Sequence, residues 1–357
     1  MKYDPAVFAV EDNYQIMVPV SSPSLMWIKI GGKCYYDECN GVMRSSNDVH
    51  KIKVPKEALD RVGAYTVCER RIPRRRAYFS KPKNLVETEY KFHPVPEKNA
   101  RAVLMSDAHS RVIEPIKAAK NFGDFDFLIF NGDMQMDSSN VKNLLVIFEI
   151  AAALTGGTKP IVFSRGNHDL RGIMAEKHTD YAPDNYGSFY YTFRLGSIWG
   201  VVLDCGEDKP DDHPEYGGTV CCHEYRLNES EFLKKVCDGG SYLDEGIETR
   251  IVIAHNPFTR ILPPPFDIEK DTYASWAKMI KEKIKPHAML CGHIHTEEIY
   301  KVGCKYDGLG QPCDIIVAGK PEKKYFAAAG ITFGDTKITV DFIDSDNKKL
   351  GTFFIEK

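Results

Sequence analysis

From Arg101 onward the sequence alternates short apolar runs with polar clusters and amphipathic segments, and this repeat limits the possible folds more than any other feature. The apolar runs cover residues 102–105, 127–130, 161–163, 251–254 and 288–290. Such short, uniformly apolar runs are typical of strands that are covered on both faces of a sheet. Helices are expected near residues 112–121 and 140–153, between the first runs, and near 229–236. Residues 188–195 and 198–203 are expected to be paired strands joined at Gly196-Ser197. The alternation predicts an α/β fold.

Each apolar run leads directly into a polar cluster at its C-terminal end. The clusters are Ser106-Asp107-Ala108-His109, Asn131-Gly132-Asp133, Arg165-Gly166-Asn167-His168-Asp169, Ala254-His255-Asn256 and Cys291-Gly292-His293-Ile294-His295. Ligand sites of open α/β sheets lie at that end of the strands. Five of the eleven histidines fall within these clusters, although the clusters are a small part of the chain. Chance placement is therefore a poor explanation.

The residue types in the clusters indicate a metal site. Asp-X-His and His-X-His spacings place both side chains on the same side of an extended segment. Imidazole and carboxylate ligands without thiolate favour Mn, Fe, Co or Zn over Ca or Mg. One such residue alone is as often a cap or a hydrogen-bonded surface group, but that explanation fails for the whole set. The candidate ligands are Asp107, His109, Asp133, Asn167, His255, His293 and His295.

The order of these motifs resembles that of the calcineurin-like metallophosphoesterase superfamily: Asp-X-His, Gly-Asp, Gly-Asn-His-Asp, His and Gly-His-X-His, over residues 107–295. The resemblance implies a four-layer α/β/β/α sandwich that holds two metal ions. It places one ion on Asp107, His109 and His295, and the other on Asn167, His255 and His293. Asp133 is expected to bridge the two ions.

Two cations roughly 3.5 to 4 Å apart can lower the pKa of a bridging water and neutralise the charge that develops during phosphoryl transfer. We therefore expect hydrolysis of a phosphomonoester or phosphodiester by a bridging hydroxide at two divalent ions, with Mn, Fe or Zn favoured. His168 is expected to protonate the leaving-group oxygen, and Asp169 to orient the His168 ring. Arg171 resembles a phosphate-contacting arginine of some branches. An ordinary salt bridge is the alternative for Arg171.

Residues 13–93 carry short β-rich runs separated by turn signals, which predicts a small β-sandwich. Pro94, Pro96 and the polar residues after them suit a linker. We therefore predict a β-sandwich domain at residues 1–98, all-β and fibronectin-III-like, followed by the phosphoesterase domain at residues 99–357.

A β-domain in that position, together with the run Asp-Cys-Gly-Glu-Asp-Lys-Pro from Asp204, resembles the purple acid phosphatase branch. That branch has a tyrosine three residues after the bridging aspartate, where this sequence has Met136. The colour-giving ferric site is therefore not expected. Protein Ser/Thr phosphatases have the pattern Gly-Asp…Val-Asp-Arg-Gly, whereas this sequence reads Gly-Asp-Met-Gln-Met-Asp. Protein phosphatase activity is therefore not favoured.

Composition bears on partners and compartment. The formal net charge is -3, so no global field recruits nucleic acid or an anionic membrane. No stretch approaches the ~20 apolar residues of a membrane span. The start lacks the pattern of a secretory signal, and the ten cysteines contain no Cys-X-X-Cys, which favours free thiols. We predict a cytoplasmic protein that acts on a small phosphorylated substrate, with no membrane partner. A nuclease would use the same metal pair, but the acidic net charge disfavours nucleic acid as a partner.

Three alternatives remain at this point. The insertion 204–226 contains Asp211, Asp212, His213, His223 and Glu224, and a solvated charged loop is favoured over a substrate-facing element. The basic run Arg70, Arg71, Arg74, Arg75 and Arg76, beside Tyr78 and Phe79, suits a polyanion, but a solvated β-edge face is favoured. A non-catalytic scaffold that retains the fold is the alternative to an enzyme, although no ligand is missing.

Overall fold

The computed structural model describes residues 1–322 and 325–357, and its largest element is a ten-stranded sheet. The order of its strands is β22 (Lys349–Glu356), β21 (Lys337–Asp344), β20 (Tyr325–Phe333), β10 (Ala100–Met105), β11 (Phe127–Asn131), β12 (Pro160–Ser164), β1 (Ala6–Val10), β2 (Asn13–Pro19) and β7 (Val49–Pro55), with β19 (Lys320–Glu322) beside β20. Strands β10, β11 and β12 run parallel, because α/β crossovers join them.

A second sheet of six strands lies against the first. Its order is β13 (Tyr191–Leu195), β14 (Ile198–Leu203), β15 (Thr249–Ala254), β16 (Ala288–Cys291), β18 (Ile315–Val317) and β17 (Glu298–Tyr300). The pairs β14–β15, β15–β16 and β16–β18 are parallel. The hairpin between β13 and β14 turns at Gly196-Ser197, as predicted.

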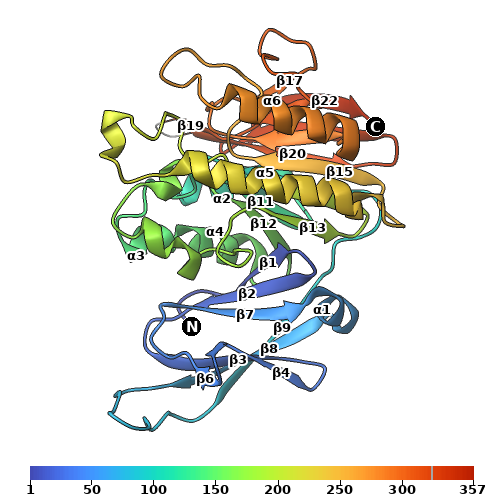
Figure 1. Cartoon of the computed structure of the whole chain (residues 1–357). Coiled ribbons are helices and arrows are strands. Elements are labelled where there is room, and N and C mark those ends of the chain that lie inside the picture. Colours follow the sequence, from blue (N-terminus) through green and yellow to red (C-terminus); the bar gives the residue numbers. More distant parts are fainter. Residues whose placement is uncertain (323–324) are drawn as a thin grey trace.

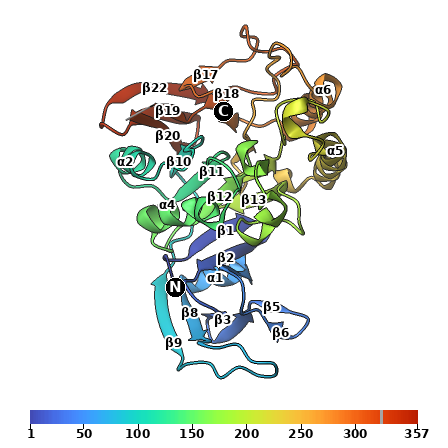
Figure 2. The same ribbon diagram turned by 90° about the vertical axis from the view of Figure 1, so that its left-hand side faces the viewer.

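Helices cover the outer face of each sheet (Figures 1 and 2). The covering helices are α2 (Ile113–Phe122), α3 (Val141–Leu144), α4 (Val146–Thr155), α5 (Cys222–Gly239) and α6 (Lys270–Met279), whereas α1 (Lys56–Val62) packs within the N-terminal part. Apolar side chains of α2 and α4 pack on the ten-stranded sheet, and those of α5 and α6 pack on the six-stranded sheet. The four-layer α/β/β/α order predicted from the sequence is confirmed.

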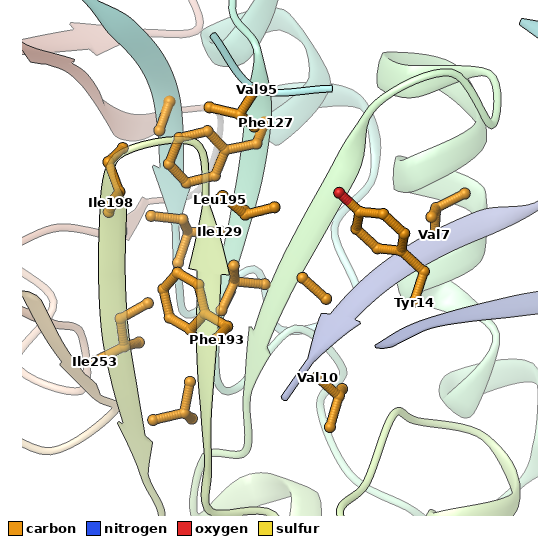
Figure 3. Packing of buried hydrophobic residues seen from close by; sticks show 14 of the residues in the cluster. Val7, Val10, Tyr14, Val95, Phe127, Ile129, Phe193, Leu195, Ile198 and Ile253 are labelled. Carbon is orange, nitrogen blue, oxygen red and sulfur yellow. The ribbon is translucent and has the colours of Figure 1, made fainter. Parts of the chain in front are cut away.

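The main hydrophobic core fills the space between the two sheets. Figure 3 shows Phe127 and Ile129 of β11 beside Phe193 of β13 and Ile253 of β15, all of them buried. The core continues into the N-terminal strands through Tyr14, which is also buried. Burial of each such side chain contributes on the order of 1.5–3 kcal/mol. This shared core fixes the separation of the two sheets and therefore the position of their strand ends.

The N-terminal part is a β-sandwich, as predicted, but one of its two layers is the end of the ten-stranded sheet. A four-stranded sheet of β4 (Lys33–Tyr36), β3 (Ser24–Ile30), β8 (Ala64–Arg71) and β9 (Val86–Lys91) packs on β1, β2 and β7. A small ribbon of β5 (Glu38–Cys39) and β6 (Val42–Met43) accompanies it. Strand β1 pairs in parallel with β12. The proposed boundary between residues 98 and 99 therefore crosses a continuous sheet.

The helices differ from the sequence predictions at three points. The helix expected at 140–153 is divided at Leu145 into α3 and α4, and Asn140 caps α3 by accepting a hydrogen bond from Asn143 N (3.0 Å). The helix expected near 229–236 already begins at Cys222 as α5. Helix α6 was not predicted.

All ten cysteines are free thiols, as expected. Among residues 1–322 and 325–357, no helix has the length and apolar character needed to cross a bilayer.

Candidate metal centre

The five polar clusters meet at one edge of the two packed sheets. Asp107 and His109 follow β10, Asp133 follows β11, Asn167 follows β12, His255 follows β15, and His293 and His295 follow β16. The strands concerned are parallel within each sheet, so their carboxyl ends lie at the same edge. The structure thus brings together all seven candidate ligands, which lie up to 188 residues apart in sequence, between Asp107 and His295.

One group of possible ligands consists of Asp107, His109 and His295, whose donor atoms all lie within 4.8 Å of one another. His295 Nε2 is 3.2 Å from Asp107 Oδ1 and 3.2 Å from His109 Nε2. Asp107 Oδ2 accepts hydrogen bonds from Ser106 Oγ (2.6 Å) and from His293 N (2.9 Å). The other oxygen of Asp107 is therefore directed at the imidazoles.

A second group consists of Asp133, His255 and His293. His255 Nε2 lies 3.2 Å from Asp133 Oδ2, while its Nδ1 donates to the carbonyl oxygen of Asn131 (2.7 Å). A carbonyl can only accept, so this bond fixes the proton on Nδ1 and leaves the Nε2 lone pair for the site. Asp133 Oδ1 accepts from the backbone N–H of His168 (2.8 Å), which directs Oδ2 into the site.

Asn167 completes the second group. With its amide nitrogen toward Asp133 Oδ2 (3.2 Å) and His293 Nδ1 (3.0 Å), its oxygen accepts from Arg171 Nη2 (2.9 Å). Rotation of the amide presents the oxygen at the same position instead, where a cation would accept it as a neutral ligand. The Asn167 side chain is buried, beside the candidate ligand His293 that was expected to share its ion.

The donor set fits divalent ions. Asp107 Oδ1 and His109 Nδ1 are buried and have no hydrogen-bond partner among residues 1–322 and 325–357. Buried polar atoms are seldom left unpaired, and leaving one unpaired costs on the order of 1–3 kcal/mol. A cation at Asp107 would satisfy the carboxylate. The donors are imidazole, carboxylate and amide groups, which suit Mn, Fe or Zn.

The backbone at the site is strained. Five candidate ligands that are not glycine have φ between 47° and 66°, in the left-handed region that such residues seldom adopt: Asp107, His109, Asp133, His293 and His295. Each such residue costs on the order of 1–3 kcal/mol, and such residues cluster at functional sites. The tight turns at the strand ends thus direct the side chains of these five residues toward the same site.

The charges at the site are balanced between carboxylates and imidazoles. Burial would raise the pKa of Asp133, but His255 and the neighbouring histidines hold that pKa well below its usual range. Burial would lower the pKa of His255, but Asp133 and Asp107 raise it to about 10, so a metal ion would bind at Nε2 by displacing a proton. Burial lowers the pKa of His109 and of His293 to about 4. Both of these imidazoles are therefore neutral at pH 7 and can donate a lone pair.

A sequence model of the calcineurin-like phosphoesterase family matches residues 100–297. The chain belongs to this family. The matched segment contains all seven candidate ligands and ends two residues beyond His295.

One solved structure extends the fold likeness of this phosphoesterase beyond that segment. Purple acid phosphatase PPD1 from yellow lupin (Lupinus luteus) seeds has a similar fold, with a TM-score of 0.60 and 14% identity over 99% of this chain and 74% of that chain. A predicted phosphoesterase from Streptococcus pneumoniae TIGR4 matches with a TM-score of 0.36 and 13% identity over 72% of this chain and 98% of that chain.

Vacuolar protein sorting 29 from Cryptosporidium parvum matches with a TM-score of 0.37 and 11% identity, over 73% of this chain and 100% of that chain. No curated protein sequence matches this chain. The likeness to the lupin enzyme covers the N-terminal β-sandwich as well as the phosphoesterase sheets, and it concerns the fold alone.

His168 of the phosphoesterase lies beside both ligand groups. Its Nε2 is 4.0 Å from Asp133 Oδ2, and its ring centroid is 4.7 Å from that of His109. Its Nδ1 donates to the carbonyl oxygen of Met136 (2.8 Å), so a neutral ring carries its proton there. One quarter of the side chain is exposed, which leaves Nε2 accessible to a bound ester.

Within the described part of the chain, Asp169 makes no hydrogen bond to the His168 ring that it was expected to orient. Its Oδ2 accepts from the backbone N–H of Gly166 (2.7 Å), and burial, with the nearby charge of Asp133, raises its pKa to about 8. Asp169 therefore supports the turn that carries the ligands, and the Met136 carbonyl orients His168. Sequence reasoning missed this contact because a backbone carbonyl has no residue-type signal.

Arg171 is near the site but already paired. Its Nε and Nη2 each donate to Glu207 (2.8 Å), which is almost fully buried, and its Nη1 is 3.3 Å from His168 Nε2. Asp208 Oδ2 lies 3.8 Å from His293 Nε2. Sequence reasoning missed Glu207 and Asp208 as site residues. The acidic run after β14 was the available signal.

The candidate residues of the 204–226 insertion have structural partners. The carboxylate of Asp211 accepts from the N–H groups of Cys222 (3.0 Å) and His223 (2.9 Å) at the start of α5. His223 Nδ1 lies 2.8 Å from Glu269, and His213 caps the short helix at Pro214–Tyr216. Asp212 and Glu224 are exposed. The structure places none of these five residues in the described ligand groups.

Gly166 allows Asn167 and Asp133 to approach each other, because a Cβ there would lie 2.2 Å from Asp133 Oδ1. We expect Gly166→Ala to displace the Asp133 carboxylate, to lower metal content and to destabilise the fold by about 1–3 kcal/mol. Metal analysis and thermal unfolding with and without added Mn would measure this. Gly239→Ala is the matched control, since a Cβ at Gly239 meets nothing within 4 Å. Equal metal content in both variants would contradict the expectation.

Proposed function

We propose that this phosphoesterase hydrolyses a small phosphomonoester or phosphodiester at a dinuclear metal centre. The observation that carries the proposal is the pair of ligand groups, Asp107–His109–His295 and Asp133–His255–His293, which form adjoining cages at one sheet edge. Asp133 also belongs to a group with His109, on the side of the first cage. A carboxylate in that position suits a bridge between two ions.

In this proposal one ion is held by Asp107, His109 and His295, the other by Asn167, His255 and His293, and Asp133 lies between them. Mn, Fe or Zn would suit these donors. Bound there, the ions would supply a water of lowered pKa and neutralise charge on the phosphoryl group. No tyrosine lies three residues after Asp133, because that position is Met136.

His168 is assigned the proton transfer to the leaving group. The Met136 carbonyl holds the proton on Nδ1 and turns Nε2 toward the site. When Nε2 also carries a proton, the leaving-group oxygen takes that proton as its bond to phosphorus breaks. In the neutral ring Nε2 accepts from Arg171 Nη1 (3.3 Å), and protonation of Nε2 would release this N–H to a phosphoryl oxygen. The pairing of Arg171 with Glu207 keeps the guanidinium plane fixed.

The side of the site next to Arg171 favours a substrate of low charge. A cleft of about 600 Å³ next to Arg171 is lined by Glu176, Glu207 and Glu215, together with apolar side chains such as Ile173. Lys209 is paired with Asp208 and Glu215 and adds no free positive charge. Repeated phosphates would meet these carboxylates, so a small phosphoester is favoured over nucleic acid.

Metal analysis combined with a substrate panel tests the proposal. We expect protein loaded with Mn or Zn to hydrolyse an aryl phosphate, a bis-aryl phosphate or both, and the panel would extend to cyclic nucleotides and nucleotides. Two ions per chain with turnover of a monoester or diester would support it. A single or empty metal site without turnover, and a stoichiometric protein partner, would indicate a scaffold instead.

The compartment is a separate proposal. The ten free cysteines, six of which are buried, suit a reducing compartment such as the cytoplasm.

A further inference from the structure

The connection between β8 and β9 presents two aromatic side chains to solvent. Tyr78 and Phe79 are each 93% exposed, although they are adjacent in sequence and Phe79 has no polar group. In Figures 1 and 2 this light-blue connection lies at the end of the molecule opposite the helix-covered sheets. Its position separates it from the metal centre. We refer to residues 70–85 as the basic aromatic loop.

The basic aromatic loop is strongly cationic. Seven basic residues and no acidic residue lie within residues 70–85, whereas the formal net charge of the whole chain is -3. The seven are Arg70, Arg71, Arg74, Arg75, Arg76, Lys81 and Lys83. Among these seven, and within the described part of the chain, only Arg71 has a carboxylate within 4.0 Å, that of Glu69 at 3.4 Å. The other six charges are not neutralised by ion pairs.

Three of these cations converge on a small pocket. Arg71, Arg75 and Lys83 line a hollow of about 330 Å³ together with Ser22, at the base of the basic aromatic loop. Arg75 also lies near Ser45 Oγ (3.4 Å). Several donors and no lining acid make this pocket suitable for a phosphate-containing headgroup. It is distinct from the metal centre, since it shares no residue with either ligand group.

We propose that the basic aromatic loop docks the protein on an anionic lipid surface. Arg71, Arg75 and Lys83 would hold a lipid headgroup phosphate, and Tyr78 and Phe79 would enter the interfacial region of the bilayer. Aromatic side chains favour that region, and clustered Lys and Arg residues are attracted to anionic lipids. Combining the two signals stabilises peripheral binding without any membrane span.

A membrane fits this loop better than single-stranded nucleic acid. Proteins that bind single strands align aromatic side chains along a groove that follows the phosphates, whereas Tyr78 and Phe79 are neighbours on one exposed connection. The earlier expectation of no membrane partner rested on net charge and on the absence of an apolar span. Net charge and the lack of a span do not reveal a local cluster of cations around exposed aromatic side chains. The inference is independent of the proposed hydrolysis.

Vesicle co-sedimentation of the full chain tests the docking. We expect binding to vesicles of phosphatidylcholine mixed with phosphatidylserine, and binding to phosphatidylcholine alone at least about tenfold weaker. R74Q/R75Q/R76Q should weaken binding to the mixed vesicles by at least about tenfold. Y78S/F79S should weaken it to a similar degree, about tenfold, because two exposed apolar groups are removed.

The matched control is K278Q/K281Q/K283Q, which removes the same number of exposed charges at the end of α6 and in the π-helical turn Ile280–Ile284 after it. Its vesicle binding should equal that of the wild type. Equal binding by the loop variants and the wild type would overturn the proposal, as would equal binding to neutral and anionic vesicles. Tighter binding to a single-stranded oligonucleotide, lost in both loop variants, would overturn it in favour of nucleic acid.

Discussion

Asp133→Asn is expected to abolish both the dinuclear occupancy and the turnover of the phosphoesterase. The Asp133 carboxylate is almost fully buried, and its pKa is held well below the usual range, so it is ionised at any working pH. Asparagine keeps the shape but removes the negative charge shared by the two cages. We expect fewer than two ions per chain and a fall in kcat of at least about a thousandfold, since metal catalysis supplies several kcal/mol.

Metal content after dialysis and hydrolysis of an aryl phosphate would both be measured for Asp133→Asn. Asp212→Asn makes the same chemical change on an exposed side chain outside the ligand groups, and it should behave as the wild type. Retention of two ions and of activity in Asp133→Asn would contradict the bridging role. A loss of activity with both ions retained would place Asp133 in proton transfer or positioning instead.

The positions of the candidate ligands could be predicted because they depend on local rules. A short apolar run followed by Asp-X-His or His-X-His specifies a buried strand and a polar strand end. Parallel strands bring such ends together. The meeting of these clusters at one edge therefore follows from the strands, whereas the division of the ligands into two groups was implied by the resemblance to the family.

Other features could not be predicted because they depend on contacts that leave no pattern in the sequence. The pairing of β1 with β12 joins Val7 to Pro160 across more than 150 residues, and no periodicity encodes such a partner. Glu207 binds Arg171 through a turn whose path depends on the packing of α5. The division of the sandwich between two sheets, and the anchoring of Arg171, are consequences of tertiary structure.

His168→Ala is expected to lower kcat in a way that depends on the leaving group. For an alkyl phosphate, whose leaving alkoxide needs a proton, we expect a loss of about 10²–10⁴-fold. For p-nitrophenyl phosphate, whose leaving phenolate is stable without a proton, the loss should be much smaller. Metal content should not change, because the His168 backbone N–H still donates to Asp133 Oδ1 after the substitution.

His93→Ala is the matched control, since His93 is an exposed histidine in the linker, and it should leave both reactions unchanged. The comparison also separates two roles that the geometry allows for His168. Its imidazole belongs to a third possible ligand group with His109 and Asp133. If His168 held a metal ion, His168→Ala would lower metal content and slow both substrates equally. Because Nε2 is 4.0 Å from Asp133 Oδ2 and one quarter of the His168 side chain is exposed, we expect the dependence on the leaving group.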